Sequence, residues 1–520
     1  MSVAERNGAG AASLAALGAL PAALSSAWFG AALVAVAIGQ QLAGHLDCDV
    51  SWFITFAEKF VDGRIPYVEV SDPNPPAAFL VFVPAVLIAR ALQVATEAVV
   101  AAMVFVGAAA SIAFAFYVLR HGAARSRRAW RLLLNAAIYL LLVAPEIVFA
   151  EREHLALLAV IPMLATLAVD ERSRRLPRAA RVVAGLGAGV AMAFKPYFAL
   201  AVAMPALATA WRERSLRGLW RAEMWTAAFV AFAYMAAIFA FFPAYWEQAL
   251  PLIVDVYARA HDDWGNIASH TLAPFYAALF AGFLAAARGL VLGRATRVAL
   301  FASLGFFVSF LVQGKGWINH AYPAVAFILF AWTFLALGDR AARTARSTGA
   351  KERLIKFLFV PALVAAPAFF GIFEQVSDRE EHPGLLDAVA RVAPPHPRIA
   401  AMASGLDFGH PLVRQLGGEW VGRQNALWVT ALVGRLLPSA ASPAYRERLE
   451  AYRRDDLEAF AQDVRALPPD VVIVEDAATR EFVLKRAETA GVLESYRLAK
   501  RAGEIEIWRR EADRGGWNLP

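Results

Sequence analysis

Two carboxylates with catalytic potential, Asp47 and Asp49, stand two positions apart directly after the first hydrophobic segment of the chain. Charged groups are costly inside a bilayer, so this place at the end of an apolar run puts both residues at a membrane boundary. Asp47 is predicted either to deprotonate an acceptor hydroxyl as a general base or to help bind a divalent cation. Asp49 has the same chemical capacity, and the alternative for it is the N-cap of the helix that follows.

The loop after these carboxylates is predicted to begin with an amphipathic helix at the headgroup boundary of a membrane. Its aromatic residues at helical spacing are Trp52, Phe53, Phe56 and Phe60. Gly63 is placed to end this helix as its C′ residue. The loop continues to a rigid Pro-Pro turn at residues 75–76, and Tyr67 and Asn74 before that turn are predicted to contact substrate.

Four consecutive ionisable residues, Glu151, Arg152, Glu153 and His154, lie between two apolar runs. On a helix Glu151 and His154 share a face, a spacing that suits joint metal binding or a hydrogen-bonded pair. Glu151 and Glu153 are therefore candidate catalytic carboxylates, and Glu151 with His154 is a candidate metal site. The alternative for the whole segment is an ordinary hydrated turn.

Lys195 stands between two half-length apolar runs and is followed by Pro196, which breaks a helix. A cation beside a broken helix at the membrane surface is a natural phosphate ligand, whereas a lysine without that role would snorkel to water. Tyr197 follows directly and is a candidate substrate contact.

The segment 315–323 adds a second cation, a histidine and aromatic rings within one loop. Lys315 and His320 are candidate donors to a phosphate, and Trp317 and Tyr322 offer faces on which a sugar ring can stack. The alternative for the two aromatic residues is the interfacial belt of a membrane protein.

The composition indicates the class of protein that must position these residues. Of 520 residues, 59% are hydrophobic and 18% are charged, and the mean hydropathy is +0.49, which indicates a polytopic membrane protein. The net charge of +7 comes mostly from arginines between apolar runs, so it indicates membrane topology rather than nucleic-acid binding. The single cysteine, Cys48, excludes an intramolecular disulfide, and the sequence has no Cys/His pattern for structural zinc. Residues 1–26 are interpreted as a signal anchor.

Apolar runs predict an α-helical membrane protein with eleven spans, although several runs are shorter than the roughly 20 residues of a full crossing. The runs are 27–44, 97–118, 131–149, 154–169, 182–194, 197–210, 222–242, 270–287, 297–313, 321–338 and 355–373. The positive-inside rule places the arginine-rich connections in the cytoplasm and the candidate residues on the opposite face. Residues 77–89 are apolar too, but counting them as a span would put every arginine cluster outside. They are therefore predicted to lie on the outer surface.

After residue 373 the pattern changes to that of a small soluble domain. Strand-like runs and charged helical stretches alternate, at 399–403, 445–464, 471–474, 477–490 and 504–508. This alternation predicts an extracytoplasmic α/β domain over 374–520, after a transmembrane catalytic domain over 1–373 whose first outer loop is 45–96. The sequence has no glycine-rich nucleotide loop and no apparent internal repeat.

Taken in order, these features resemble the GT-C superfamily of glycosyltransferases. They are an acidic residue after the first span, juxtamembrane helices, a Pro-Pro turn, a second acidic loop, a lysine at a broken helix and a soluble C-terminal domain. The closer likeness, over roughly residues 27–340, is to the protein-mannosyltransferase and lipid A aminoarabinose-transferase branch. The resemblance implies a polyprenyl-phosphate-linked sugar donor, transfer on the periplasmic face and inversion at the anomeric carbon.

The resemblance also implies roles for single residues. Asp47 or Asp49 would be the first acidic residue, Glu151 or Glu153 the second, and Lys195 the lysine near the donor phosphate. One departure is residue 74, an asparagine where that branch usually has lysine before two prolines. Phosphate recognition at this turn would then depend on other cations, with Lys195, Arg152 and Lys315 as candidates.

Together these observations predict a glycosyltransferase of the inner (cytoplasmic) membrane that acts in cell-envelope glycan or lipopolysaccharide biosynthesis. Its partners would be a polyprenyl-phosphate sugar, membrane lipid and a lipid, glycan or protein acceptor, with no nucleic acid. A divalent metal cation is the one cofactor that the residues suggest. The alternatives are a lipid or polysaccharide transporter and a non-catalytic binder of lipid-linked sugar. A transporter would show inverted repeats and ionisable residues near the midplane, which this sequence does not.

Overall fold

The computed structural model describes residues 23–44, 46–121, 125–169, 176–269, 272–337, 339 and 382–511. The chain divides into two compact units. Unit 1 comprises Met1–His45, Val100–Met235 and Asp262–Phe373. Unit 2 comprises Leu46–Val99, Ala236–His261 and Glu374–Pro520.

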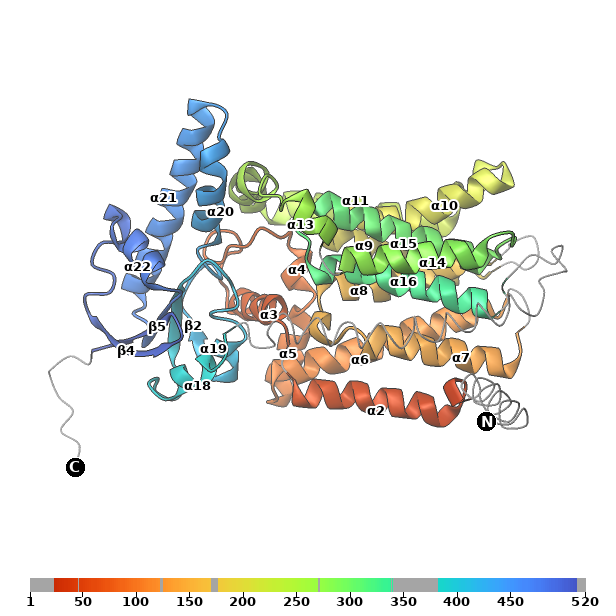
Figure 1. The fold of residues 1–520 in the computed structure, drawn as a ribbon, viewed down its shortest axis with the longest axis horizontal. Helices are drawn as coiled ribbons and strands as arrows, with labels where there is room; N and C mark the ends of the chain where they lie inside the picture. The colour runs from red at the N-terminus through yellow and green to blue at the C-terminus, as the bar shows by residue number, and fades with distance from the viewer. Residues whose placement is uncertain are drawn as a thin grey trace, which may run out of the picture. The chain divides into compact units, whose positions relative to one another are not determined.

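Unit 1 is a bundle of apolar helices (Figure 1). The helices are α2 (Ala27–Ala43), α6 (Thr96–Leu119), α7 (Arg127–Ile138), α8 (Arg152–Leu167), α9 (Arg178–Phe194), α10 (Ala199–Glu213), α11 (Ala222–Phe241), α13 (Trp264–Ser269), α14 (Leu272–Ala287), α15 (Arg294–Gln313) and α16 (Ile318–Ala336). A π-helical turn over Tyr139–Val143 continues α7. The ends of α6 and α11 extend into unit 2.

Four of the described helices, α6, α11, α15 and α16, are long and apolar enough to cross a membrane by themselves. Apolar helices of this length support a membrane protein. The predicted count of eleven spans is not confirmed, because the other bundle helices are shorter or less apolar than a full crossing requires. The predicted span 355–373 lies outside the described residues.

Arginine-rich connections converge on one end of unit 1. The Nε of Arg294, at the start of α15, donates to the carbonyl of Leu167 at the end of α8 over 2.7 Å. The amide of Thr296 donates to Asp339, just after α16, over 2.8 Å, and Arg125 before α7 lies 4.0 Å from the same carboxylate. The opposite ends of these helices must then meet at the other end of unit 1. The side of the membrane that each end faces stays a prediction.

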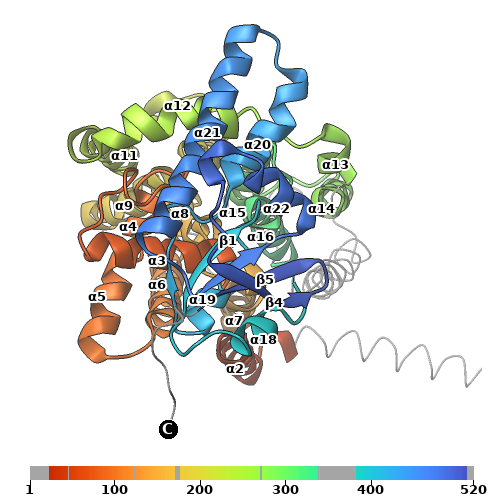
Figure 2. The same ribbon diagram turned by 90° about the vertical axis from the view of Figure 1, so that its left-hand side faces the viewer.

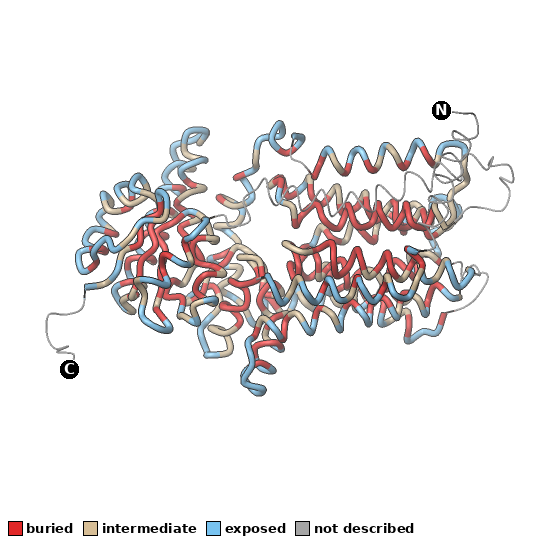
Figure 3. The backbone as a smooth tube through the Cα atoms, turned by 60° about the horizontal axis from the view of Figure 1, so that its bottom comes forward, coloured by how far each residue is buried: buried red, intermediate tan, exposed pale blue. Residues whose placement is uncertain are grey.

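Small residues let α9 approach its neighbours closely. A Cβ at Gly187 would lie 2.3 Å from the carbonyl oxygen of Ala159 in α8, and one at Gly189 would lie 2.4 Å from the Cβ of Val230 in α11. Buried residues follow the facing sides of the bundle helices (Figure 3). This packing fixes the end of α9, after which Lys195 follows.

Unit 2 contains a five-stranded sheet in the order β2-β1-β3-β5-β4 (Figure 2). The strands are β1 (Arg398–Met402), β2 (Glu419–Trp420), β3 (Val471–Val474), β4 (Tyr496–Ala502) and β5 (Ile505–Arg510). Strands β2, β1 and β3 are parallel, and β5 pairs antiparallel with β3 and β4. The helices of this part are α18 (Leu385–Ala390), α19 (Leu412–Gln415), α20 (Trp428–Leu436), α21 (Pro443–Ala466) and α22 (Ala477–Leu484). Side chains of β1 and β3 pack against α21 in the core.

The first loop also belongs to unit 2, where it forms α3 (Cys48–Val61), α4 (Ala77–Leu80) and α5 (Val83–Leu92). The amphipathic helix is present as α3, and Gly63 follows it in the left-handed conformation that ends a helix. Its apolar face packs on protein rather than on lipid, which corrects the expectation of a face floating at the headgroups. Trp52, Phe53 and Phe56 are at most 1% exposed, and the ring of Phe56 stacks on that of Phe79 in α4 at 4.1 Å.

The apolar segment 77–89 is broken into two short helices, α4 and α5, which contact α3. Each is shorter than a helix that crosses a bilayer. Its place on the outer surface stays a prediction.

Residues of the C-terminal part hold the first loop within unit 2. Arg414, after cis-Pro411, donates both terminal nitrogens to Glu58 of α3, over 2.6 and 3.0 Å, and its Nε to Glu97. Lys59 donates to the carbonyl of Gly422 over 2.8 Å. The predicted boundary at 373/374 falls outside the described residues, and independent folding of 374–520 stays a prediction.

Candidate active site

A buried polar cluster forms around Lys195 at the end of unit 1 opposite the arginines. The Lys195 Nζ donates to the carboxylate of Glu153, to Gln313 Oε1 over 2.7 Å and to His320 Nε2 over 3.0 Å. All four side chains are buried, with at most 8% exposed. A charged pair is thus held, with two neutral partners, in the interior of a helix bundle.

Local sequence explains how the four residues meet. Pro196 cannot continue α9, so Lys195 adopts an extended conformation and Pro196–Phe198 forms a single 3-10 turn before α10. Glu153 lies in the first turn of α8, where the helix dipole favours a carboxylate. Gln313 is the last residue of α15, and His320 lies in the first turn of α16.

The hydrogen bond between Lys195 and His320 indicates which ring nitrogen of His320 carries the proton. A lysine ammonium has three donor hydrogens and no acceptor, so His320 Nε2 must be the acceptor and the ring proton must lie on Nδ1. His320 Nδ1 and the second oxygen of Glu153 are buried, and neither has a hydrogen-bond partner among the described residues. Buried polar atoms without partners are costly, so both atoms favour an incoming polar ligand.

The charges near this cluster sum to one positive charge. Arg152 acts electrostatically on Glu153, and Lys315 acts on His320. Arg152 Nε lies 4.0 Å from Glu151, which is the N-cap residue of α8 and is 2% exposed. With His320 neutral, the cations Arg152, Lys195 and Lys315 outnumber the carboxylates Glu151 and Glu153 by one, and this sign of charge suits an anionic group.

The segment 151–154 is therefore not a hydrated turn, because α8 begins at Arg152 and buries all four residues. His154 does not fit the predicted metal site. Its Nδ1 accepts from the amide of Ala150 over 3.1 Å, and its Nε2 donates to the carbonyl of Leu141 over 2.9 Å. Both ring nitrogens are thus occupied, which leaves no lone pair for a metal and corrects that prediction.

The aromatic candidates of unit 1 differ in their surroundings. Tyr322 is 1% exposed and donates its hydroxyl to the carbonyl of Leu140, so it packs in the core of the bundle. The ring of Trp317 is 45% exposed and lies 5.1 Å from the ring of His320. Tyr197 is half-buried beside Lys195. Trp317 and Tyr197 therefore stay candidates for substrate contact.

The structure corrects the assignment of the first helix cap in unit 2. Asp47, and not Asp49, is the N-cap residue of α3, and its Oδ1 accepts from the amide of Asp49 over 2.8 Å. Asp49 lies in the first turn of the helix. A carboxylate oxygen of each lies within 4.8 Å of one from the other, so the two can act on one substrate or cation.

Tyr67 and Asn74 build the turn after α3. Asp72, which is buried, accepts from the indole of Trp52 and from the amide of Asn74, each over 2.8 Å. Tyr67 is 2% exposed and donates its hydroxyl to the carbonyl of Asn74 over 2.8 Å. This network gives Tyr67 a structural role in the turn, and its contact with substrate stays a prediction. The half-buried Asn74 also donates its side-chain amide to Asp72.

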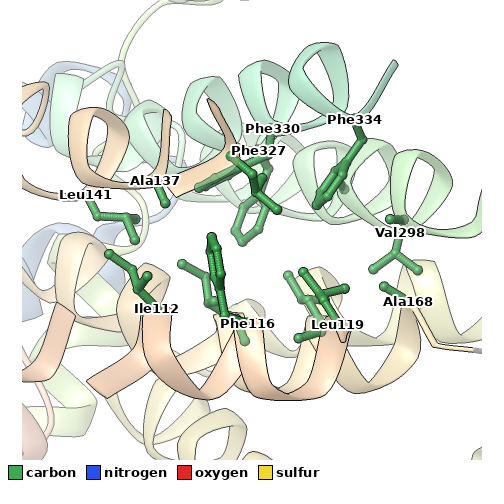
Figure 4. A pocket seen from close by; sticks show the side chains of 17 residues that line it. Ile112, Phe116, Leu119, Ala137, Leu141, Ala168, Val298, Phe327, Phe330 and Phe334 are labelled. Atoms are coloured by element: carbon green, nitrogen blue, oxygen red, sulfur yellow. The ribbon is translucent and has the colours of Figure 1, made fainter. Parts of the chain in front are cut away.

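An apolar cavity of about 70 Å³ lies within unit 1 (Figure 4). Its lining includes Ile161 of α8, Ala168 directly after α8, and Phe327 and Phe334 of α16. Ile161 follows Glu153 by eight residues, and Phe327 and Phe334 follow His320 by seven and fourteen. These side chains therefore lie near the helix faces that carry Glu153 and His320. At 1.5 Å per residue, the cavity begins about 10 Å from the polar cluster and reaches about 20 Å from it. Its side chains are apolar, as a site for a hydrocarbon chain requires.

No protein-family model matches the sequence, and no curated protein sequence matches it significantly. A solved structure does match, that of ArnT from Cupriavidus metallidurans in the apo state, with a TM-score of 0.52 over 92% of this chain and 97% of that chain. The chain has an ArnT-like fold. The match therefore bears out the predicted resemblance at the level of the fold. At 14% sequence identity the likeness is one of fold.

The fold match leaves the roles of single residues open. Sequence reasoning placed Lys195, Glu153 and His320 among the candidates, and the structure brings these three together. Gln313 was not predicted, although it is a polar residue at the end of the apolar run 297–313, directly before Gly314. Asp47 and Asp49 belong to unit 2, and their approach to Lys195 stays a prediction.

Proposed function

We propose that this chain is an integral membrane glycosyltransferase that moves a sugar from a polyprenyl-phosphate carrier to a lipid, glycan or protein acceptor, with inversion at the anomeric carbon. The buried Lys195 cluster in an ArnT-like fold is the observation that carries the proposal. A cation fixed at one end of an apolar bundle suits a phosphate that is attached to a hydrocarbon chain.

The donor phosphate would reach Lys195 by exchange with a neutral partner. All three donor hydrogens of Lys195 are engaged by Glu153, Gln313 and His320. Losing Gln313 costs one hydrogen bond to a neutral acceptor, whereas losing Glu153 would separate a buried ion pair. A phosphate oxygen would therefore replace Gln313 Oε1 as an acceptor from Lys195. Arg152 is close enough to add further positive charge.

The prenyl chain would run from this phosphate towards the apolar cavity between α8 and α16. The cavity is lined by apolar residues of α8 and α16, the helices that carry Glu153 and His320, which supports this path. Trp317 and Tyr197, beside the cluster, would contact the sugar.

Transfer would be a direct displacement. The acceptor hydroxyl oxygen attacks the anomeric carbon, the bond from that carbon to the phosphate oxygen breaks, and polyprenyl phosphate leaves with the bonding electrons. Asp47 would take the proton of the hydroxyl. Its Oδ1 caps α3, which leaves Oδ2 beside the Cys48 thiol for this purpose.

A divalent cation belongs to the same proposal. The carboxylates of Asp47 and Asp49 are hard oxygen ligands of the kind that Mg²⁺ and Ca²⁺ prefer. Glu151 is a further candidate, whereas His154 is excluded by its two hydrogen bonds. A bound cation would stabilise the negative charge that develops on the leaving phosphate.

The proposal is tested by turnover of the purified protein in liposomes with a panel of polyprenyl-phosphate-linked sugars and periplasmic acceptors. Release of polyprenyl phosphate is followed by mass spectrometry. Asp47→Asn should lower turnover about 100-fold or more and keep the fold, since asparagine caps a helix as well as aspartate does. Asp62→Asn changes an exposed carboxylate at the other end of α3 and serves as the matched control. Normal turnover by the Asp47→Asn variant would remove Asp47 from the mechanism.

A further inference from the structure

A second polar cavity lies at the arginine-rich end of unit 1. Its volume is about 210 Å³, and it lies among the end of α10, the start of α11 and the start of α15. Arg217, Arg221 and Arg294 line it, with the hydroxyls of Ser215 and Thr209 among them. Arg294 begins the helix that Gln313 ends, so this cavity is about 28 Å along α15 from the Lys195 cluster. The two sites are therefore separate.

The charges of this cavity leave one cation unbalanced. Glu213 pairs with Arg294, and Glu223, which is fully buried, lies 2.8 Å from Arg221 Nε. The Arg217 guanidinium has no hydrogen-bond or ion-pair partner among the residues that the structure describes. A single unbalanced guanidinium in a cavity with two hydroxyls suits a group that carries one negative charge, such as a phosphodiester.

Exposed tryptophans mark the depth of the cavity in a membrane. Trp211 is 88% exposed, Trp220 is 68% exposed and Trp225 is 58% exposed, and all three lie in the segment that forms the cavity or beside it. The rings of Trp220 and Trp225 lie 5.6 Å apart. Tryptophans on the surface of membrane proteins gather at the level of the lipid headgroups. The phosphate at this depth belongs to a lipid rather than to bulk solution.

We propose that this cavity binds the phosphodiester headgroup of an anionic phospholipid. Arg217 and Arg221 donate to the phosphate oxygens, Ser215 and Thr209 contact the polar headgroup, and the exposed tryptophans flank the glycerol backbone. Basic pockets between membrane helices recognise anionic headgroups through this combination of charge and depth. A zwitterionic phospholipid carries no net charge to balance Arg217 and binds less tightly.

Native mass spectrometry of the full-length protein in detergent tests this site, with phosphatidylglycerol and phosphatidylcholine as titrants. Phosphatidylglycerol should bind at least about fivefold more tightly than phosphatidylcholine, the scale of one arginine at a lipid surface. Arg217→Ala should abolish that preference. Arg212→Ala removes an exposed arginine of α10 that does not line the cavity, and it should leave the preference unchanged.

Three outcomes would overturn the proposal. The first is equal affinity for the two lipids, and the second is an equal loss in the Arg212→Ala and Arg217→Ala variants, which would indicate general surface charge. The third is displacement of bound phosphatidylglycerol by millimolar inorganic phosphate, which would indicate a site for a soluble anion. Arg217 is exposed, so the variant should fold, and its unfolding temperature checks that it does.

Discussion

Replacing Glu153 by glutamine should destabilise unit 1 strongly, because it leaves the Lys195 ammonium buried without its counter-charge. Glu153 is fully buried and Lys195 is 6% exposed, and the other partners of Lys195 are neutral. Breaking a buried ion pair by removing one partner costs about 3–5 kcal/mol.

The double variant Glu153→Gln with Lys195→Met separates the charge effect from packing. It removes both charges, so it should be more stable than the sum of the two single losses predicts, by at least about 1 kcal/mol. The free energy of unfolding is measured by titration with SDS in mixed micelles. Glu213→Gln is the matched control, because it breaks a partly exposed pair with Arg294 and should cost less than about 1 kcal/mol. Equal losses for Glu153→Gln and Glu213→Gln would refute the buried ion pair.

Three further predictions concern unit 2. Arg414→Ala should lower the free energy of unfolding by about 1.5–3 kcal/mol, because it breaks charged hydrogen bonds to Glu58 and Glu97. Arg435→Ala removes an exposed arginine and should leave the free energy of unfolding unchanged. Equal effects of the two substitutions would contradict a stabilising role of the Arg414 contacts. Burial raises the pKa of Asp456 to about 6, so the folded state holds a proton between that pH and the ordinary value of 3.8, and stability falls as pH rises through this window. Asp456→Asn should be more stable than the wild type at pH 8 and lose this dependence in thermal unfolding; an unchanged pH profile would count against it. Cysteines at positions 74 and 94, in a Cys48→Ser background, should both react with a membrane-impermeant periplasmic reagent, and cytoplasmic labelling at 94 would show that 77–94 crosses the membrane.

Much of the helical fold was predictable from apolar runs, because α6, α11 and α16 carry enough hydrophobic residues to be recognised without any partner. The start of α8 was not, since Arg152, Glu153 and His154 look like a loop unless their buried partners are known. The partner of Glu153, Lys195, lies more than 40 residues away along the chain.

The tail shows the same limit. β1, β3 and β5 were expected from their apolar runs, and the structure confirms them. β2 is only two residues long. β4, at the edge of the sheet, has three basic residues among its seven, so neither strand has an apolar run to reveal it.

Within the candidate site, residue types alone indicated which side chains could bind a phosphate, but not how they are engaged. The sequence does not show that His154 spends both ring nitrogens on backbone groups or that Tyr67 is buried. It also does not show that Asp47 caps α3, because the cap depends on whether the helix begins at residue 48 or 50. Each of these outcomes depends on backbone geometry within one turn.

The most direct test of the central claim is to locate the donor phosphate. A polyprenyl-phosphate analogue with a photoreactive group next to the phosphate is cross-linked to the purified protein, and the labelled peptides are mapped by mass spectrometry. A donor site at the Lys195 cluster predicts labels in segments 151–154, 195–197 and 313–320. In the Lys195→Ala variant, labelling should fall at least about tenfold, the scale of one charged hydrogen bond. Labels outside these segments, or full labelling of the Lys195→Ala variant, would contradict a donor site at the Lys195 cluster.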